Sequence, residues 1–574
     1  MALLTRYRLL GLVVFPPLLL LCVVLIELEE HPMAPVPRFP EAEATPPPAC
    51  TTNPVVTEHG PICGVIDESS SIRRFLGIRY AAPPTRWQAP ESPEPWQDIQ
   101  PATRFGDACP QVLDPNMIGD YTVGEDCLFL NVWTPTPDTE TETTPGLPVM
   151  VFIHGGAFMS GGSGADVTMP EGKIPSLYDG SALAQRDVVI VTLNYRLGAL
   201  GFLVHEESGI EGNFGFLDQQ LALRWVRNNI AGFGGDPNQV TLFGESAGAM
   251  SVALHTLSAP TSDELFTRAI MQSNPLSLPY KSPSEAAKIG HGFVELIGGA
   301  ERLHTADVYE ILAAQRCWAL AIPAALGGFE EVLLWSPVVD GEVIVDQPIF
   351  GRLHKPTLLG TNRAEGQIFI DLATGTAGEL GARAYDQTLH VLYREQAHTV
   401  RAEYPALTDS DNRAQLADIF SDYLFTCPNH YLAERSKAPV YSYRFVFEPP
   451  FNVWSGTSPN CADLVCHGDE LSYVFDTGHE LFTPQGQRLA EQVGDYWTNF
   501  ARGDADPNRP LATTTTWDPF PSYLLLDDPI RAGGLDSYDH CELWHKIGYD
   551  IEHPINTTLL DLEVWLAEVS GVCK

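Results

Sequence analysis

A serine between two glycines is the strongest chemical signal in the chain. Residues 244–248 form a G-x-S-x-G pattern around Ser246, directly after an apolar, strand-like run at 240–243. In this pattern the serine occupies a tight strand-to-helix turn that exposes its hydroxyl, and the glycines leave room for the turn. A segment rich in Gly, Asp and Pro at 233–238 precedes the strand, as such a turn requires. The pattern therefore predicts Ser246 as a nucleophile.

A glycine loop upstream of the serine could stabilise negative charge on a reacting oxygen. The apolar run at 147–153 predicts a buried strand that opens into His154 and two glycines. We expect the backbone amides of Gly156, Ala157 and Ala247 to face a developing oxyanion. The alternative is that the glycines only form a turn. His154 is expected to brace the loop rather than to transfer protons.

Further motifs occur in an order that resembles the type-B carboxylesterase and cholinesterase family. They are residues 125–133, 154–158, 194–198, 218–226 and 243–249. The similarity runs from about Val55 to near Gly548. It implies the α/β-hydrolase fold, in which a large, mostly parallel sheet has helices on both faces and helical insertions form a lid. It also implies a triad of serine, glutamate and histidine.

The acid and the base of that triad follow from chain order. A serine hydroxyl needs a base to take its proton and a carboxylate to orient the base, and in this fold the acid precedes the histidine. Glu365 matches the family's acid, although it could instead be a surface glutamate paired with Arg363. Among 16 histidines, His467 begins the His-Gly dipeptide that follows Glu365, and it matches the family's base.

The resemblance implies hydrolysis of small-molecule carboxylic esters through an acyl-enzyme, without a cofactor. Glu245, beside the serine, is expected to organise buried water or polar groups behind the pocket, or to be an ordinary buried glutamate. No metal site is predicted, because Cys and His residues do not cluster at ligand spacing. The acyl and alcohol groups of the substrate and the oligomeric state do not follow from the sequence.

Two other functions remain open. A cholinesterase needs an aromatic cage for a quaternary ammonium group. The family's cholinesterases carry a key tryptophan in the first disulfide loop, but residues 109–127 contain none, so general esters are favoured. A cage could still be assembled from Phe158, Trp318 or Phe329. Some family members are adhesion proteins that lack the serine or the histidine, whereas here all three triad positions are filled.

Charge and length bound the remaining possibilities. Arg and Lys total 34 against 73 Asp and Glu, a formal net charge of −39 that disfavours nucleic acid as a partner. The chain has 574 residues, of which 44% are hydrophobic, enough for one large catalytic domain over 50–574.

The first residues predict export. Arg6 and Arg8 precede an uncharged stretch at 9–26, so residues 1–30 are expected to be a signal or a signal anchor. A proline-rich linker at 31–49 follows. The catalytic domain is expected on the non-cytoplasmic side, either secreted or tethered to a membrane through 9–26, and cleavage of the segment is undetermined.

The cysteines agree with export. Ten remain when Cys22 is set aside, and an even number is typical of disulfide-bonded proteins. The resemblance implies the pairs Cys109–Cys127 and Cys427–Cys541, and Cys461 with Cys466 can form a local link. Cys50 could pair with Cys63, but the sequence leaves this pairing open. Cys317 and Cys573 remain unassigned.

Periodicity predicts the elements that position these residues. Antiparallel strands are expected within 60–81, and further strands at 149–154, 187–194, 265–272, 440–447 and 523–526. Helices are expected at 218–228 and 490–501, through much of 281–335 and 370–436, and at 556–569. The two long helical regions should form the lid and one wall of the site.

Overall fold

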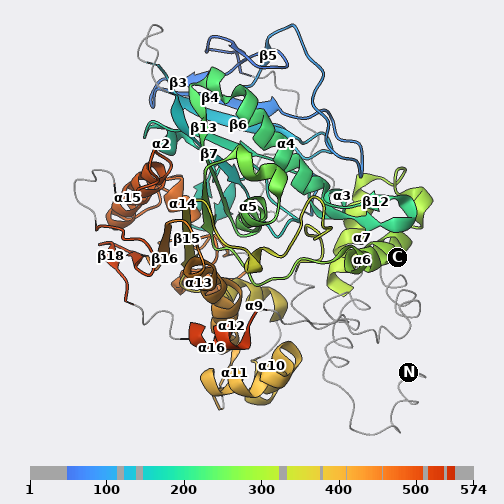
Figure 1. The fold of residues 1–574 in the computed structure, drawn as a ribbon, viewed down its shortest axis with the longest axis vertical. Helices are drawn as coiled ribbons and strands as arrows, with labels where there is room; N and C mark the ends of the chain where they lie inside the picture. The colour runs from blue at the N-terminus through green and yellow to red at the C-terminus, as the bar shows by residue number, and fades with distance from the viewer. Residues whose placement is uncertain are drawn as a thin grey trace.

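The central feature of the molecule is a large twisted sheet (Figure 1). The computed structural model describes residues 48–112, 122–137, 146–321, 333–374, 379–408, 410–455, 457–508, 515–534 and 540–549. Within these residues the sheet has eleven strands in the order β18-β17-β16-β15-β14-β13-β7-β10-β6-β4-β3. In chain order they are β3 Val65–Asp67, β4 Ile72–Arg79, β6 Phe129–Pro135, β7 Leu147–Ile153, β10 Val189–Leu193, β13 Gly235–Glu245, β14 Arg268–Gln272, β15 Thr357–Asn362, β16 Val440–Phe445, β17 Tyr523–Leu526 and β18 Arg531–Ala532.

The middle of the sheet is parallel and its two edges are antiparallel. Every pairing from β10 through β7, β13, β14, β15 and β16 to β17 is parallel. The pairings of β10 with β6, of β6 with β4, of β4 with β3 and of β17 with β18 are antiparallel. All residues of β10 and β15 are buried, as strands covered on both faces require. The predicted mostly parallel sheet is confirmed.

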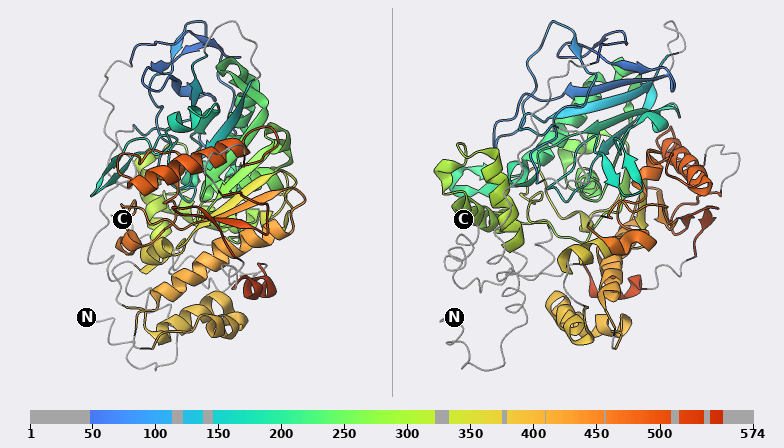
Figure 2. Two further views of the ribbon diagram at one scale, coloured as in Figure 1. Left: turned by 90° about the vertical axis from the view of Figure 1, so that its left-hand side faces the viewer. Right: turned by 180° about the vertical axis from the view of Figure 1, so that it is seen from behind.

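Helices cover both faces of the sheet because successive side chains of a strand point to opposite sides. In β7, Val149 and Val151 enter one hydrophobic core, while Met150 and Phe152 enter the other. The first core contains side chains of α4 (Phe214–Asn229) and α5 (Ala247–Leu257). The second contains those of α2 (Ser181–Ala184), α14 (Leu471–Val474) and α15 (Pro484–Phe500). Figure 2 shows the layers from two further sides.

Two groups of helices extend beyond these layers, one at the right and one at the lower end of the molecule in Figure 1. One consists of α6 (Pro283–Leu296) and α7 (Val308–Ala321). The α6 helix begins with a capping box, in which the Ser282 and Glu285 side chains bond each other's backbone amides, and with proline at its first position. The other group consists of α9 Gln367–Thr374, α10 Ala382–Tyr393, α11 Ala397–Glu403, α12 Arg413–Phe420, α13 Cys427–Glu434 and α16 Cys541–Ile547. The helix expected at 556–569 lies outside the described residues.

Disulfides join both neighbouring and distant segments of the chain. The expected pairs Cys109–Cys127, Cys427–Cys541 and Cys461–Cys466 are present, and Cys50 is bonded to Cys63. Cys317 is disulfide-bonded as well. Several disulfides in one chain indicate an oxidising compartment, so the folded protein belongs outside the cytosol.

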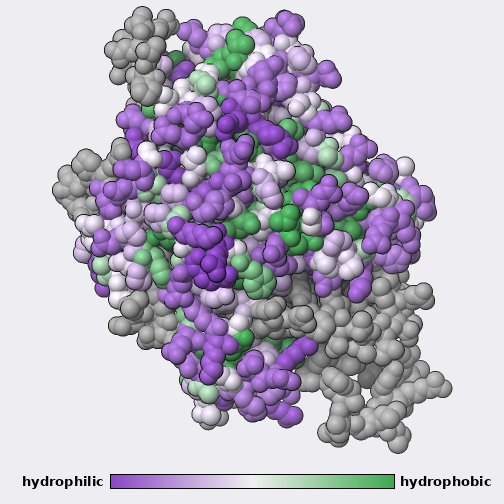
Figure 3. All heavy atoms as spheres, viewed as in Figure 1, coloured by the Kyte–Doolittle hydropathy of each residue, from purple (hydrophilic) through white to green (hydrophobic). Residues whose placement is uncertain are grey.

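The surface of the described part is mainly hydrophilic on the face seen in Figure 3, with some hydrophobic residues near its centre. Among the described helices, none combines the length and the apolar character needed to span a bilayer. The possible anchor at 9–26 and most of the linker at 31–49 lie outside the described residues.

Candidate active site

Ser246 occupies the turn between β13, which ends at Glu245, and α5, which begins at Ala247. Its backbone has φ 55° and ψ −123°, a strained conformation for a residue with a side chain. The Ser246 amide donates to the carbonyl oxygen of Gln272 on β14 at 3.0 Å, which holds the turn against the neighbouring strand. Ser246 is partly exposed although its chain neighbours are buried, so its hydroxyl is accessible.

Backbone packing explains both glycines of the G-x-S-x-G pattern. A Cβ at Gly248 would lie 2.0 Å from the carbonyl oxygen of Ile153, at the end of β7. A Cβ at Gly244 would lie 2.6 Å from the backbone carbonyl carbon of Gly248. Because β7, β13 and α5 meet at these two positions, any side chain there would push the elbow apart.

The glycine loop after β7 packs directly against the elbow. A Cβ at Gly155 would approach Glu245 Oε2 to 2.7 Å and Ser246 Cβ to 3.0 Å. Gly156 and Ala157 follow with φ of 100° and 54°, and both are partly exposed. Within the described residues, the amides of Gly156, Ala157 and Ala247 donate no hydrogen bond. These amides are therefore available to an oxygen atom bound beside Ser246.

His154 holds this loop from inside the protein. Its Nδ1 lies 2.8 Å from the carbonyl oxygen of Gly155, and its ring stacks on Tyr195 with centroids 4.5 Å apart. The Tyr195 hydroxyl donates to the carbonyl oxygen of His154 at 3.0 Å. Burial lowers the pKa of His154 to about 4, so its imidazole is neutral at neutral pH.

His467 and Glu365 meet through a short, buried contact. His467 Nδ1 lies 2.6 Å from Glu365 Oε2, with side-chain exposures of 6% and 0%. The other oxygen of Glu365 accepts a hydrogen bond from the backbone amide of Asn362 at 2.6 Å, which orients the carboxylate. The alternative of a surface pair between Glu365 and Arg363 is wrong, because Arg363 pairs with Glu448 at 3.5 Å on the surface.

The loops that carry these two residues are joined to each other. The Ala364 amide donates to the carbonyl oxygen of Val465 at 2.8 Å. The indole of Trp454 donates to the carbonyl oxygen of His467 at 2.7 Å, and the Cys461–Cys466 disulfide ends one residue before the histidine. Rings of Phe369 and Phe425 lie 5.2 Å from the imidazole, measured between centroids. The imidazole is thus held from several sides.

Glu245 is buried beside the imidazole of His467. Its Oε1 lies 3.2 Å from His467 Nε2, and both side chains are 6% exposed. Neither atom has a hydrogen-bond partner among the described residues, so the contact is electrostatic. Glu245 therefore faces the imidazole nitrogen that does not contact Glu365.

Glu470 is a further buried carboxylate, which the sequence analysis did not single out. It accepts the Asn362 side-chain amide at 2.6 Å and the Gln272 side-chain amide at 3.0 Å. The indole of Trp497 donates a hydrogen bond to the side-chain oxygen of Gln272 at 3.1 Å. Acidic residues are common directly before a helix, so the pair at 469–470 gave no signal of its own in the sequence.

These carboxylates control the protonation of His467. Burial by itself would lower its pKa, but the charges of Glu245 and Glu365, with the hydrogen bond that the imidazole donates to Glu365, outweigh it and raise the pKa to about 9. Burial also raises the pKa of Glu245, an effect that the positive charge of a protonated His467 opposes, and the pKa of Glu470 is raised as well. The arrangement therefore favours the protonated form of the imidazole.

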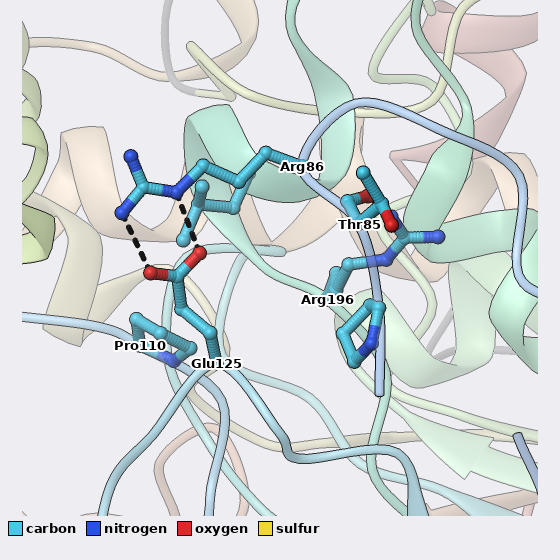
Figure 4. A pocket seen from close by; sticks show the side chains of 7 residues that line it. Thr85, Arg86, Pro110, Glu125 and Arg196 are labelled. Carbon is cyan, nitrogen blue, oxygen red and sulfur yellow. Dashed lines mark hydrogen bonds and ion pairs between the residues drawn. The ribbon is translucent and has the colours of Figure 1, made fainter. Parts of the chain in front are cut away.

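A separate small hollow contains two of the family-motif residues (Figure 4). It has a volume of about 10 Å³, the room of roughly one water molecule, and is lined by Pro84, Thr85, Arg86, Pro110, Glu125, Arg196 and Leu200. Arg86 pairs with Glu125 at 2.6 Å, and the buried Arg196 pairs with Asp218 at 2.7 Å. Since both cations are already neutralised, these motif residues brace the fold.

A parallel sheet that presents a strained serine at a strand-to-helix turn, with a buried histidine–glutamate pair, defines an α/β-hydrolase. The solved structure of a PNB esterase matches with a TM-score of 0.70 and 30% identity, over 87% of this chain and 100% of that chain. The carboxylesterase family model matches residues 51–543, and the chain belongs to this family of ester hydrolases.

Curated relatives cover most of the chain. Crystal protein of Dictyostelium discoideum is 36% identical over 533 residues, which are 87% of this chain and 92% of that protein. Fumonisin B1 esterase of Sphingopyxis macrogoltabida is 36% identical over 500 residues, which are 80% of this chain and 84% of that protein.

Proposed function

We propose that the chain hydrolyses carboxylic esters with Ser246 as nucleophile, His467 as general base and Glu365 as the acid that orients it. The observation that carries the proposal is the buried 2.6 Å contact between His467 Nδ1 and Glu365 Oε2. It is supported by the strained, accessible position of Ser246 at the end of β13. A carboxylate on Nδ1 leaves Nε2 as the nitrogen that exchanges protons with the serine.

The reaction has two similar halves. Ser246 Oγ attacks the ester carbonyl carbon while His467 Nε2 takes the hydroxyl proton, and the same proton then leaves with the alcohol. In the second half, water attacks the carbonyl carbon of the acyl-enzyme by the same steps. The oxyanion of each tetrahedral intermediate binds the amides of Gly156, Ala157 and Ala247, each donor contributing roughly 3 to 4 kcal/mol to transition-state stabilisation.

Glu245 sets the pH range of this chemistry. Because His467 Nε2 must be unprotonated to accept the serine proton, a carboxylate 3.2 Å away makes the base harder to deprotonate. Activity is therefore expected to rise toward alkaline pH. In the intermediate, the same carboxylate stabilises the imidazolium that forms when the proton arrives.

The proposed substrates are neutral esters of small molecules. Of the aromatic residues considered for a quaternary-ammonium cage, Phe158 and Trp318 are buried in the hydrophobic core, and Phe329 lies outside the described residues. Buried rings cannot form the open face that a cation needs. The negative net charge of the chain makes nucleic acid an unsuitable partner. We further propose that the exported protein is either secreted or tethered through residues 9–26.

Hydrolysis of a p-nitrophenyl ester series, graded by acyl length, tests the function and sizes the acyl pocket. An organophosphate should block the activity, and peptide mapping should find the phosphoryl group on Ser246. A folded protein that neither hydrolyses any ester nor reacts with the organophosphate would favour the adhesion-type alternative.

A further inference from the structure

A second cluster of histidines and a carboxylate joins α13 to α16. His430 and Glu434 lie one turn apart on α13, and His545 comes from α16. One ligand atom from each of these three residues lies within 4.8 Å of the other two. The disulfide Cys427–Cys541 links the first residues of the same two helices, which lie side by side in Figure 1. The two histidines thus lie one helical turn from a covalent link that fixes their separation.

The Glu434 carboxylate lies between the two imidazoles at distances longer than hydrogen bonds. His430 Nδ1 is 3.9 Å from Glu434 Oε1, and His545 Nδ1 is 3.7 Å from Glu434 Oε2. The two rings stack with centroids 5.4 Å apart and an interplanar angle of 29°. Such spacing leaves room for an ion between the three groups.

His545 carries its proton on the nitrogen that faces away from Glu434. Its Nε2 lies 3.3 Å from the carbonyl oxygen of Cys427, and a carbonyl can only accept a hydrogen bond. Nδ1 therefore keeps its lone pair, directed toward Glu434. A backbone carbonyl that fixes the tautomer in this way is the usual support of a metal-bound histidine.

The His430 imidazole is mostly buried, with its side chain 11% exposed. Its ring packs against Phe520 with centroids 5.0 Å apart, which limits its rotation.

We propose that His430, Glu434 and His545 bind a divalent transition-metal ion, Zn²⁺ in particular, with water as the fourth ligand. Two imidazoles and one carboxylate are a ligand set that zinc uses in proteins. Tetrahedral bonds of about 2.1 Å place ligand atoms about 3.4 Å apart. The ligand atoms of the cluster lie within 4.8 Å of one another, so they must approach by up to about 1.4 Å to hold the ion. Glu434, whose side chain is 47% exposed, has the freedom to make this approach.

The sequence does not reveal this site, because its third ligand is distant along the chain. His430 and Glu434 show only an i, i+4 spacing, which is common on solvated helix faces. The disulfide and the packing of α16 against α13 bring His545 to them. A bound ion would add a second cross-link between these helices.

Titration of the metal-free full-length protein with ZnCl₂, in competition with a chromophoric chelator, tests the proposal. Wild type should bind one Zn²⁺ per chain at this cluster, and its melting temperature should rise with zinc. His545→Ala and Glu434→Gln should each weaken that binding at least tenfold and remove the thermal shift. Glu434 is exposed, so its variant keeps the test valid if His545→Ala fails to fold.

A matched control is available one residue before α16. His540 Nδ1 pairs with Glu403 at 2.8 Å on the surface, a histidine–carboxylate pair that is not part of the three-residue cluster. His540→Asn should bind zinc as wild type does. Absence of stoichiometric binding in wild type, or equal affinity in the cluster variants and His540→Asn, would overturn the proposal.

Discussion

The cluster around His467 and the cluster of His430, Glu434 and His545 both bring imidazole nitrogens to carboxylate oxygens, yet they differ in burial and in distance. His467 contacts Glu365 at 2.6 Å, with side chains 6% and 0% exposed. In the other cluster the contacts are 3.7 and 3.9 Å, and Glu434 is 47% exposed. Water screens a carboxylate as exposed as Glu434 much more strongly than one as buried as Glu365.

As a consequence, the pKa values of His467 and His430 shift in opposite directions. Buried carboxylates raise the pKa of His467 to about 9 against the effect of burial. For His430 burial prevails, and its pKa falls to about 4. The first imidazole is therefore mainly protonated at neutral pH, whereas the second is mainly neutral. Similar residues thus have different chemistry because their carboxylates differ in solvent exposure.

Replacement of the serine should have the largest effect, and it should affect one cluster only. In Ser246→Ala the attacking oxygen is absent, so kcat should fall by at least about a thousandfold. The melting temperature and the zinc affinity should remain those of wild type, because the substitution removes one partly exposed hydroxyl. Steady-state hydrolysis of a p-nitrophenyl ester measures this. Activity within tenfold of wild type would assign the nucleophile to another residue.

Removal of the charge on Glu365 should have the next largest effect. In Glu365→Gln the side-chain amide cannot stabilise the imidazolium, and kcat should fall about a hundredfold to ten-thousandfold. The matched control is Glu448→Gln, which removes a surface carboxylate that pairs with Arg363 at 3.5 Å. This control should change kcat less than twofold. Equal losses in the two variants would contradict the role assigned to burial.

The pH dependence should report the charge of Glu245. His467 must be neutral to act as base, so kcat/KM falls as the pH drops through the pKa of His467. A pKa raised to about 9 places this acid limb well above 6.5, the ordinary value for histidine. Glu245→Gln removes a neighbouring negative charge, and the limb should move to lower pH by about 1 unit or more. Limbs near pH 6.5 in both proteins would exclude this coupling.

Each histidine cluster has a disulfide beside it, and removal of the two disulfides should affect stability and catalysis to different extents. Cys427–Cys541 spans 114 residues and Cys461–Cys466 spans 5. In the chain-entropy model their loss lowers the free energy of unfolding by roughly 4 to 5 and about 2 kcal/mol. Replacement of the long-range pair by serines should therefore reduce stability more. Replacement of the short pair, one residue from His467, should reduce kcat more, as denaturant melts and ester assays would reveal.

The smallest effect is expected for a positive charge on the substrate. At low salt the net charge of −39 could favour acetylcholine over its uncharged dimethylbutyl isostere by a small factor. At high salt the ratio of their kcat/KM values should approach one, since the field is screened within about 8 to 10 Å. A large preference that persists at high salt would indicate a cation site and the cholinesterase alternative.

Some features could be predicted from the sequence because local sterics determine them. Gly244 and Gly248 admit no side chain where β7, β13 and α5 meet, so the motif around Ser246 is visible in a few consecutive residues. Alternating and continuous apolar runs likewise predicted the strands of the parallel sheet. The choice of Glu365 and His467 relied on chain order within a family pattern. The predictions for residues 1–30 and 556–569 fall outside the described residues and stay predictions.

Tertiary structure alone decided which charged groups meet. Glu245 lies beside Ser246 in the chain, but its contact with His467 depends on the packing of two distant loops. Glu470 acquires its partners from β14 and β15, and His545 reaches α13 through a disulfide over 114 residues. Sequence periodicity records which face of an element is buried, but not which side chains of different elements become neighbours. Because pKa values depend on those neighbours and on exclusion of water, the protonation of both histidine clusters emerged only with the fold.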